Sequence, residues 1–203
     1  MKKLISDFIN YLCYKYWSTR VTLLDKQVSF YRSTRISYSQ GASKKNIVLD
    51  YKARIHGTLS VCSEGRIKVG KYSQVGPDSF IRAVNNVEIG DLTSISTGVV
   101  ISDNNSHPVN PFDRLIMQRT SAGDVKRGWI YSDNAPIIIG TNCWIGENAR
   151  ICKGVRIGDG SVVAANAVVT KDVPTNCIVA GNPARIVKTG IDVSTKRYFH
   201  DVD

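Results

Sequence analysis

The stretch that decides the fold is PIIIGTNCWIGENARICKGVRIGDGSVVAANAVVTKDV, residues 136–173. An aliphatic residue returns at every sixth position, and a small or β-branched residue follows four positions after each. The first set is Ile139, Ile145, Ile151, Ile157, Val163 and Val169; the second is Cys143, Ala149, Val155, Ser161, Ala167 and Val173. This period matches neither an amphipathic helix, at about 3.6 residues, nor an exposed strand, at about 2. It predicts a solenoid of short parallel strands that turns a corner every six residues.

The same spacing appears earlier, in the runs Val69, Val75, Ile81 and Ile89, Ile95, Ile101. An aliphatic-x-aliphatic-Gly motif ends at each of Gly70, Gly90, Gly140 and Gly158, which gives intervals of 20, 50 and 18 residues. Three hexads make 18 residues, so one interval is one triangular coil, and the interval of 50 contains an insertion. We therefore predict an all-β, three-sided prism of about five to six coils, with aliphatic side chains inside.

These boundaries divide the chain into three parts. Residues 47–185 form the β-helix domain, and its inserted active-site loop is 103–136. Residues 1–46 lack the hexad and form an N-terminal capping segment. It contains a short amphipathic helix, predicted from the helical spacing of Ile5, Phe8, Ile9, Leu12 and Tyr16. Residues 186–203 form a basic C-terminal tail. An open solenoid end needs a cap, and either terminus supplies a candidate.

The composition favours some classes of binding partner but does not identify one. The chain has 203 residues, 27 Lys and Arg against 17 Asp and Glu, and a net charge of +10. A basic surface favours anionic partners, but no basic run is interleaved with aromatic residues, so we do not expect nucleic acid. Five cysteines with no CxxC pair indicate reduced thiols. No window is apolar enough to span a membrane, and polar residues interrupt the N-terminal apolar run. We expect a cytoplasmic protein, with peripheral contact at the inner face of the membrane left open.

Three segments carry a resemblance to a known family: Pro136–Gly146, Gly154–Asp159, and Val169–Pro174 with Ala180–Arg185. They resemble the hexapeptide-repeat acyltransferases, most nearly the galactoside, maltose and glycan O-acetyltransferases. The match is strong over 136–188, moderate over 67–109 and absent over 1–46. It implies a left-handed parallel β-helix, an exception to the usual crossover hand. It also implies a homotrimer in which acetyl-coenzyme A (acetyl-CoA) and the acceptor meet between subunits.

Acetyl transfer to a hydroxyl requires a base, and only His56, His107 and His200 are histidines. His107 stands in SDNNSHPV, residues 102–109, where the repeat gives way to the insertion. Related sugar acetyltransferases carry their catalytic histidine in a similar His-Pro context, so we expect His107 to be the general base. The three histidines also raise the hypothesis of a zinc site, as in γ-class carbonic anhydrases. Their wide spread argues against it, and no metal is expected.

The resemblance also implies a donor site. The backbone at Gly146 and Glu147 faces the thioester, although the family often has Ser where Glu147 stands. Ala165 leaves room for the pantetheine arm, and Trp144 forms a wall of the groove. Thr170, Lys171, Arg185 and Lys188 meet the nucleotide end and its phosphates. For the lysines, a solvated charged surface is the simpler alternative.

For the acceptor, Asp78, Asn85 and Asp103 flank the expected cleft, and turn formation is the alternative for each. The insertion is basic and contains Trp129, which suits an anionic or bulky glycan. We expect an O-acetyltransferase that acts on a sugar or surface glycan. Two alternatives stay open: acetylation of an antibiotic or other small alcohol, and a non-catalytic trimeric scaffold that binds glycan.

Overall fold

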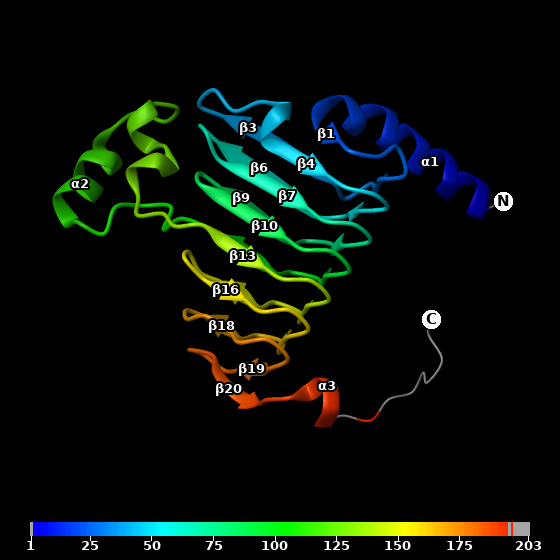
Figure 1. Ribbon diagram of the computed structural model, residues 1–203. Helices are drawn as coiled ribbons and strands as arrows, with labels where there is room; N and C mark the ends of the chain where they lie inside the picture. The colour runs from blue at the N-terminus through cyan, green and yellow to red at the C-terminus, as the bar shows by residue number, and fades with distance from the viewer. Residues whose placement is uncertain (1, 195, 197–203) are drawn as a thin grey trace.

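The computed structural model describes residues 2–194 and 196. Three parallel sheets form the sides of a prism that narrows toward its C-terminal end (Figure 1). Sheet A contains β1 (Thr22–Leu23), β4 (Ile47–Leu49), β7 (Arg66–Val69), β10 (Asn86–Ile89), β13 (Ile137–Ile139) and β16 (Arg156–Ile157). Sheet B contains β2 (Ser29–Phe30), β5 (Arg54–Ile55), β8 (Gln74–Val75), β11 (Ser94–Ile95), β14 (Trp144–Ile145), β17 (Val162–Val163), β19 (Ile178–Ala180) and β20 (Arg185–Lys188). Sheet C contains β3 (Arg35–Ser39), β6 (Thr58–Cys62), β9 (Phe80–Ala83), β12 (Val100–Ser102), β15 (Arg150–Ile151) and β18 (Val168–Val169).

Each coil runs from sheet A to B to C, so the described residues form six complete coils and part of a seventh. The prism interior is the hydrophobic core. The inward positions of the hexads stack in register, as in Ile95 beside Ile145 and Ile101 beside Ile151, and their side chains are fully buried. The predicted solenoid and its register are therefore confirmed. We call the turns between sheets the A–B, B–C and C–A corners.

Small hydroxyl residues at the corners bond one coil to the next. The hydroxyl of Thr93 donates to the carbonyl oxygen of Gly140 at 2.7 Å and accepts the amide of Cys143 at 3.1 Å. Ser73 does the same toward Gly90 and Thr93, at 2.6 and 2.9 Å. These hydroxyls are buried, so both backbone partners would otherwise lack a hydrogen bond. Small residues are favoured at the corners because larger side chains would not fit, and small hydroxyl residues also supply these hydrogen bonds between coils.

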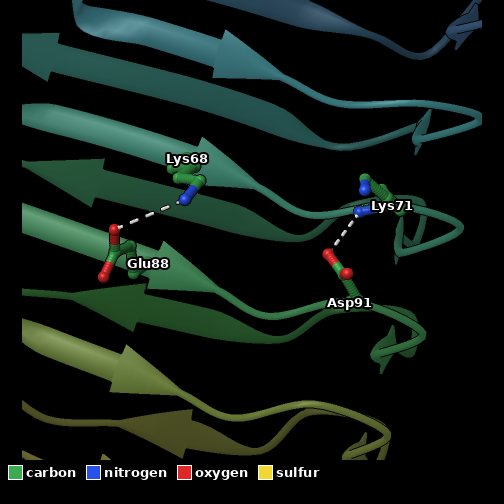
Figure 2. Close-up of polar contacts among 4 residues, drawn as sticks. All are labelled: Lys68, Lys71, Glu88 and Asp91. Atoms are coloured by element: carbon green, nitrogen blue, oxygen red, sulfur yellow. Dashed lines mark hydrogen bonds and ion pairs between the residues drawn. The ribbon is translucent and has the colours of Figure 1, made fainter. Parts of the chain in front are cut away.

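Aspartates of the Ile-Gly-Asp motif add a second bridge at the A–B corner. The Oδ1 atom of Asp91 accepts the backbone amide of Lys71, one coil earlier, at 2.8 Å (Figure 2). Asp159 accepts the amide of Thr141 at 2.7 Å in the same way. The nearby ion pair between Lys68 and Glu88 spans 3.9 Å between half-exposed side chains (Figure 2), and such pairs contribute little. Backbone bonding, rather than surface charge, holds the coils in register.

The β-helix begins one coil earlier than expected. β1, β2 and β3 pair in parallel with β4, β5 and β6, so the predicted domain boundary at residue 47 is wrong and the helix starts at Thr22. The sequence conceals this coil because Leu23 and Phe30, its inward residues on sheets A and B, are seven positions apart. The 3-10 turns Ser18–Arg20 and Lys44–Asn46 flank the coil.

The predicted N-terminal helix exists as α1 (Lys2–Trp17). It lies across the wide end of the prism (Figure 1). Cys13, Tyr14 and Trp17 pack against the core, and the Tyr14 ring lies 6.3 Å from that of Phe30. The apolar stripe that suggested the helix is exposed instead, including Ile5, Phe8, Leu12 and Tyr16.

At the other end, the predicted tail begins as a strand. β20 turns back and pairs antiparallel with β19, so the expected boundary at residue 186 falls inside it. The chain then forms the short helix α3 (Ile191–Ser194). The Ala-Gly-Asn-Pro stretch at 180–183 ends the parallel coils, as the sequence indicated.

Candidate active site

The insertion leaves the prism at the C–A corner of the fourth coil and stands off to one side (Figure 1). It contains α2 (Pro111–Arg119) and the 3-10 turns Val125–Arg127 and Trp129–Tyr131. Asn110 caps α2 by accepting the Phe112 amide at 2.9 Å, and Pro111 occupies the first turn. The insertion docks beside sheet C, because the Gln40 amide donates to the Val125 carbonyl at 3.0 Å.

Asp103 is the residue from which the insertion starts, and it is fully buried. Its carboxylate accepts the backbone amides of Val84 at 3.0 Å and Asn85 at 2.7 Å. Its own carbonyl accepts the amide of Ala135, where the insertion returns, at 2.9 Å. Burial raises the pKa of Asp103, although the hydrogen bonds that it accepts from Asn104 and the backbone act in the opposite direction. Asp103 thus joins the start of the insertion to the preceding coil through its carboxylate, and to the end of the insertion through its backbone carbonyl.

His107 is exposed, and α2 holds its ring. The Nδ1 atom lies 3.1 Å from the Sδ atom of Met117. A thioether sulfur accepts a hydrogen bond but cannot donate one, so this contact favours the tautomer with its proton on Nδ1. Among the described residues Nε2 has no hydrogen-bond partner, and its lone pair is available as a base.

A cleft of about 380 Å³ adjoins this pair. Pro108, Asp113, Ile116, Met117, Lys126 and Tyr131 line it. The lining combines a carboxylate, an ammonium and a phenol with apolar surface, which is a set able to bind a polyhydroxylated molecule of moderate size. Because Met117 belongs both to this cleft and to the histidine contact, the cleft lies next to His107.

The residues expected at the thioester gather at the B–C corner. Trp144 is 56 % exposed, and its indole donates to the Ser96 hydroxyl of the preceding coil at 3.2 Å. Gly146 sits so close to the next coil that an added Cβ would lie 2.6 Å from the amide nitrogen of Ala165. The Gly146 amide already donates to Val163, at 2.8 Å. Glu147 and Ala165 are exposed on successive coils, and together these residues line one edge of the prism.

The residues expected at the nucleotide end lie on the last coils and are all exposed. Thr170 and Lys171 follow β18 at the C–A corner, whereas Arg185 and Lys188 lie on β20. The Ala184 amide bonds to Val168 at 2.8 Å, which brings the start of β20 to the start of β18. The four residues therefore surround the narrow end of the prism instead of forming one line.

The three predicted acceptor residues do not converge. Asp78 occupies a B–C corner with φ of 55°, the position that Gly98 and Asn148 take in the next two coils. Asn85 lies at the C–A corner, and its side-chain amide donates to Asn134 of the insertion at 3.0 Å. Asp78 therefore shares an edge with the donor residues, while Asn85 and Asp103 lie beside the insertion.

His107 and the donor residues occupy different corners of one chain. A strand of sheet C separates the C–A corner from the B–C corner, on the order of 15 Å at about 3.3 Å per residue. The sequence alone does not reveal two residues of the site: Met117, which contacts His107, and Ser96, which accepts a hydrogen bond from Trp144. Neither residue lies in a recognisable motif. Met117 is ten positions from the histidine, and Ser96 is 48 positions from the tryptophan.

The other histidines lie elsewhere. His56 stacks on Tyr31 at a B–C corner, with ring centroids 3.6 Å apart, and burial together with the charge of Arg54 lowers its pKa. His200 lies outside the described residues. Within residues 2–194 and 196, no cluster of three His, Cys, Asp or Glu side chains is placed to hold a metal ion. In the same part of the chain, no helix has the length and apolarity needed to cross a membrane.

Known acyltransferases share the repeat and the fold of this chain. Residues 136–171 match the family model described as the hexapeptide repeat of succinyl-transferase. The AntD N-acyltransferase from Bacillus cereus has the same fold, with a TM-score of 0.66 over 86 % of each chain at 18 % identity. The hexapeptide-repeat acetyltransferase VCA0836 from Vibrio cholerae is 28 % identical, with a TM-score of 0.51 over 75 % of this chain and 70 % of that one. The fold is a left-handed parallel β-helix.

Relatives by sequence give the family. The galactoside O-acetyltransferase of Escherichia coli (strain K12) is 40 % identical over 115 residues, which span 57 % of this chain but only 50 % of that protein. The "Putative lipopolysaccharide biosynthesis O-acetyl transferase WbbJ" of the same strain is 29 % identical over 163 residues, 78 % of this chain and 81 % of that one. In sequence and in fold, the chain is similar to the hexapeptide-repeat acyltransferases.

Proposed function

We propose that the protein transfers an acetyl group from acetyl-CoA to a hydroxyl of a sugar or surface glycan. The observation that carries this proposal is the His107 ring, whose Nδ1 faces Met117 at the edge of a cleft and whose Nε2 has no hydrogen-bond partner among the described residues. Similarity to relatives named as galactoside and lipopolysaccharide O-acetyltransferases supports the reaction class. The use of acetyl-CoA, a cytoplasmic metabolite, supports a cytoplasmic location.

His107 acts as the general base in this proposal. Its Nε2 removes the proton from the acceptor hydroxyl as the oxygen attacks the thioester carbonyl. The tetrahedral intermediate then collapses, the carbon–sulfur bond breaks, and the departing thiolate takes the proton back from Nε2. The Gly146 amide cannot stabilise the oxyanion, because it already donates to Val163. That task falls to a neighbouring donor at the same corner, and the Glu147 backbone is our candidate.

The donor lies along the B–C edge. Trp144 walls the groove, and Ala165, which has no side chain beyond Cβ, lets the pantetheine arm pass. Thr170, Lys171, Arg185 and Lys188 surround the narrow end, where their charges and hydroxyl suit the phosphates of the nucleotide. For the acceptor, we assign Asn85 and Asp78 to contact with the sugar. We assign Asp103 a positioning role, because its carboxylate is buried and fully engaged.

The separation of the two corners supports a homotrimer. The His107 corner of one copy would face the B–C edge of the next, so each site would combine two chains. Mixing two inactive variants tests this arrangement: His107→Ala, and Ala165→Phe to block the groove. In mixed trimers confirmed by mass, we expect about one site in three to recover if each site draws on two copies. If such oligomers regain no activity, His107 and the donor groove of each site belong to the same chain.

An acceptor screen tests the reaction itself. Purified protein and acetyl-CoA are incubated with sugars, polysaccharides and small alcohols, and mass spectrometry detects a product heavier by one acetyl group. We expect sugar products, and expect His107→Ala to lose most of kcat while its affinity for CoA stays within a few-fold. Products restricted to antibiotic-like alcohols would favour the second enzyme hypothesis. Glycan binding without CoA-dependent thermal stabilisation would favour the scaffold.

A further inference from the structure

The N-terminal helix presents its apolar face away from the protein. Seven residues of α1 fall within an arc of about 140°, at about 100° per residue. They are Leu4, Ile5, Phe8, Tyr11, Leu12, Lys15 and Tyr16, and all are exposed. Leu4 is 75 % and Phe8 61 % exposed. We call this set the outer face of α1. In an ordinary surface helix the apolar face is the buried one, so this arrangement is inverted.

The opposite face of the helix meets its own chain. Cys13, Tyr14 and Trp17 pack on the core. Further toward the N-terminus, Ile5, Ser6, Ile9 and Asn10 line a groove against the first coil, so Ile5 lies where the groove borders the outer face. The packing of Cys13, Tyr14 and Trp17 sets which side of the helix faces the prism, and the outer face stays exposed. Figure 1 shows α1 at the end of the prism, where the other coils do not cover it.

The charge of the chain is concentrated in the same segment. Residues 1–46 contain nine Lys or Arg and two Asp, a net of +7 of the total +10. Lys15 lies in the middle of the outer face, 5.6 Å from the Tyr11 ring centroid, and Arg20 lies 4.1 Å from the Tyr16 ring centroid. Exposed apolar and aromatic side chains bordered by cations are the combination that partitions into the interface of an anionic bilayer.

We propose that the outer face of α1 binds the surface of an anionic membrane, with the helix parallel to the bilayer plane. The helix has 16 residues and is too short to span, so it lies at the interface. Leu4, Phe8 and Leu12 enter the acyl boundary, while Lys15 and Arg20 meet lipid phosphates. In this orientation the wide end of the prism faces the bilayer. This proposal does not depend on the reaction proposed above, because it uses none of the residues at the two corners.

Vesicle flotation of the full chain tests the proposal. One set of vesicles contains phosphatidylcholine alone, and the other equal parts of phosphatidylcholine and phosphatidylglycerol. We expect binding to the anionic set, weakened by salt, and little to the neutral set. Phe8→Glu should lower the partition coefficient at least about tenfold, through loss of apolar burial. Lys15→Gln should lower it about fivefold on anionic vesicles alone.

A matched control separates the helix from general surface polarity. Leu12 is 49 % and Leu92 56 % exposed, but Leu92 lies at the A–B corner of the fourth coil. Leu12→Glu should weaken vesicle binding, whereas Leu92→Glu should leave it unchanged. Equal effects of the two variants, or no binding by the wild type, would overturn the proposal. So would a change of oligomeric mass in Leu12→Glu without vesicle binding by the wild type, because the face would then be a contact between copies.

Discussion

The Sδ atom of Met117 lies 3.1 Å from Nδ1 of His107, a contact that favours the tautomer with Nε2 as the basic nitrogen. Leucine fills a similar volume but cannot accept a hydrogen bond, so Met117→Leu should cost less than about 1.5 kcal/mol of stability. We expect kcat to fall several-fold, because this tautomer is no longer favoured. KM for acetyl-CoA should not change. Steady-state kinetics measures both, and an unaltered kcat would assign Met117 to packing alone.

Buried Asp103 predicts how stability varies with pH. Its pKa is raised above the ordinary value of 3.8 in the folded protein. The folded state thus binds the proton more tightly than the unfolded state, and this group's contribution to stability falls as pH rises from about 3.8 through the raised pKa. Asn cannot titrate, so the stability of the wild type relative to Asp103→Asn should decrease over that interval. Denaturant unfolding at several pH values measures it. An increase would mean that the backbone amides outweigh burial.

Thr93 tests the bridge between coils. Thr93→Val keeps the shape but removes the hydroxyl, leaving the Gly140 carbonyl and the Cys143 amide without their partner. We expect a loss of about 1–3 kcal/mol. Thr93→Ser retains the hydroxyl and serves as the control, with a smaller loss. Equal losses in the two variants would show that the methyl group, rather than the hydroxyl, matters at this corner.

Variants at the narrow end of the prism test whether the nucleotide of acetyl-CoA binds there. Arg185→Ala or Lys171→Ala should raise KM for acetyl-CoA more than it lowers kcat, because the charges meet phosphates remote from the reacting carbonyl. Dephospho-CoA lacks the 3′-phosphate and should distinguish poorly between the wild type and at least one variant. Arg156→Ala is the control, since Arg156 is exposed on sheet A. Calorimetric titration that finds unchanged CoA affinity in both variants would place the donor groove elsewhere.

The hexad predicted the prism from residue 47 onward. Each side of a coil needs one inward aliphatic side chain and one small residue at the corner, so both recur every six residues. It missed the first coil, since an extra residue between Leu23 and Phe30 breaks the period. Helical spacing found α1, but a stripe on a helix does not reveal which side the protein covers. Leu12 and Tyr16 of that stripe are exposed, while Cys13 and Tyr14 are packed against the core.

The candidate site was harder to predict for a geometric reason. Family motifs identify His107 and Trp144 as members of one site, but only the fold shows that they occupy different corners of a chain. Asp103 was expected at the acceptor because polar residues flanked the histidine. A sequence does not distinguish a carboxylate that faces a ligand from one that accepts the amides of Val84 and Asn85. The roles assigned to His107 and the donor residues remain predictions for the variants above.

The reversal of the chain at β20 has a consequence for how copies meet end to end. A stack of parallel strands that stopped at β19 would present an open edge, on which the first coil of another molecule could continue the ladder into a fibre. β20 instead pairs antiparallel with β19 and becomes the edge strand of sheet B, while the backbone of Gly181 and Ala184 occupies the polar groups of Val168 on sheet C. Charged side chains on an edge strand discourage further pairing, and Arg185 and Lys188 are both exposed on β20. The residues proposed to meet the nucleotide therefore also protect this edge against end-to-end growth.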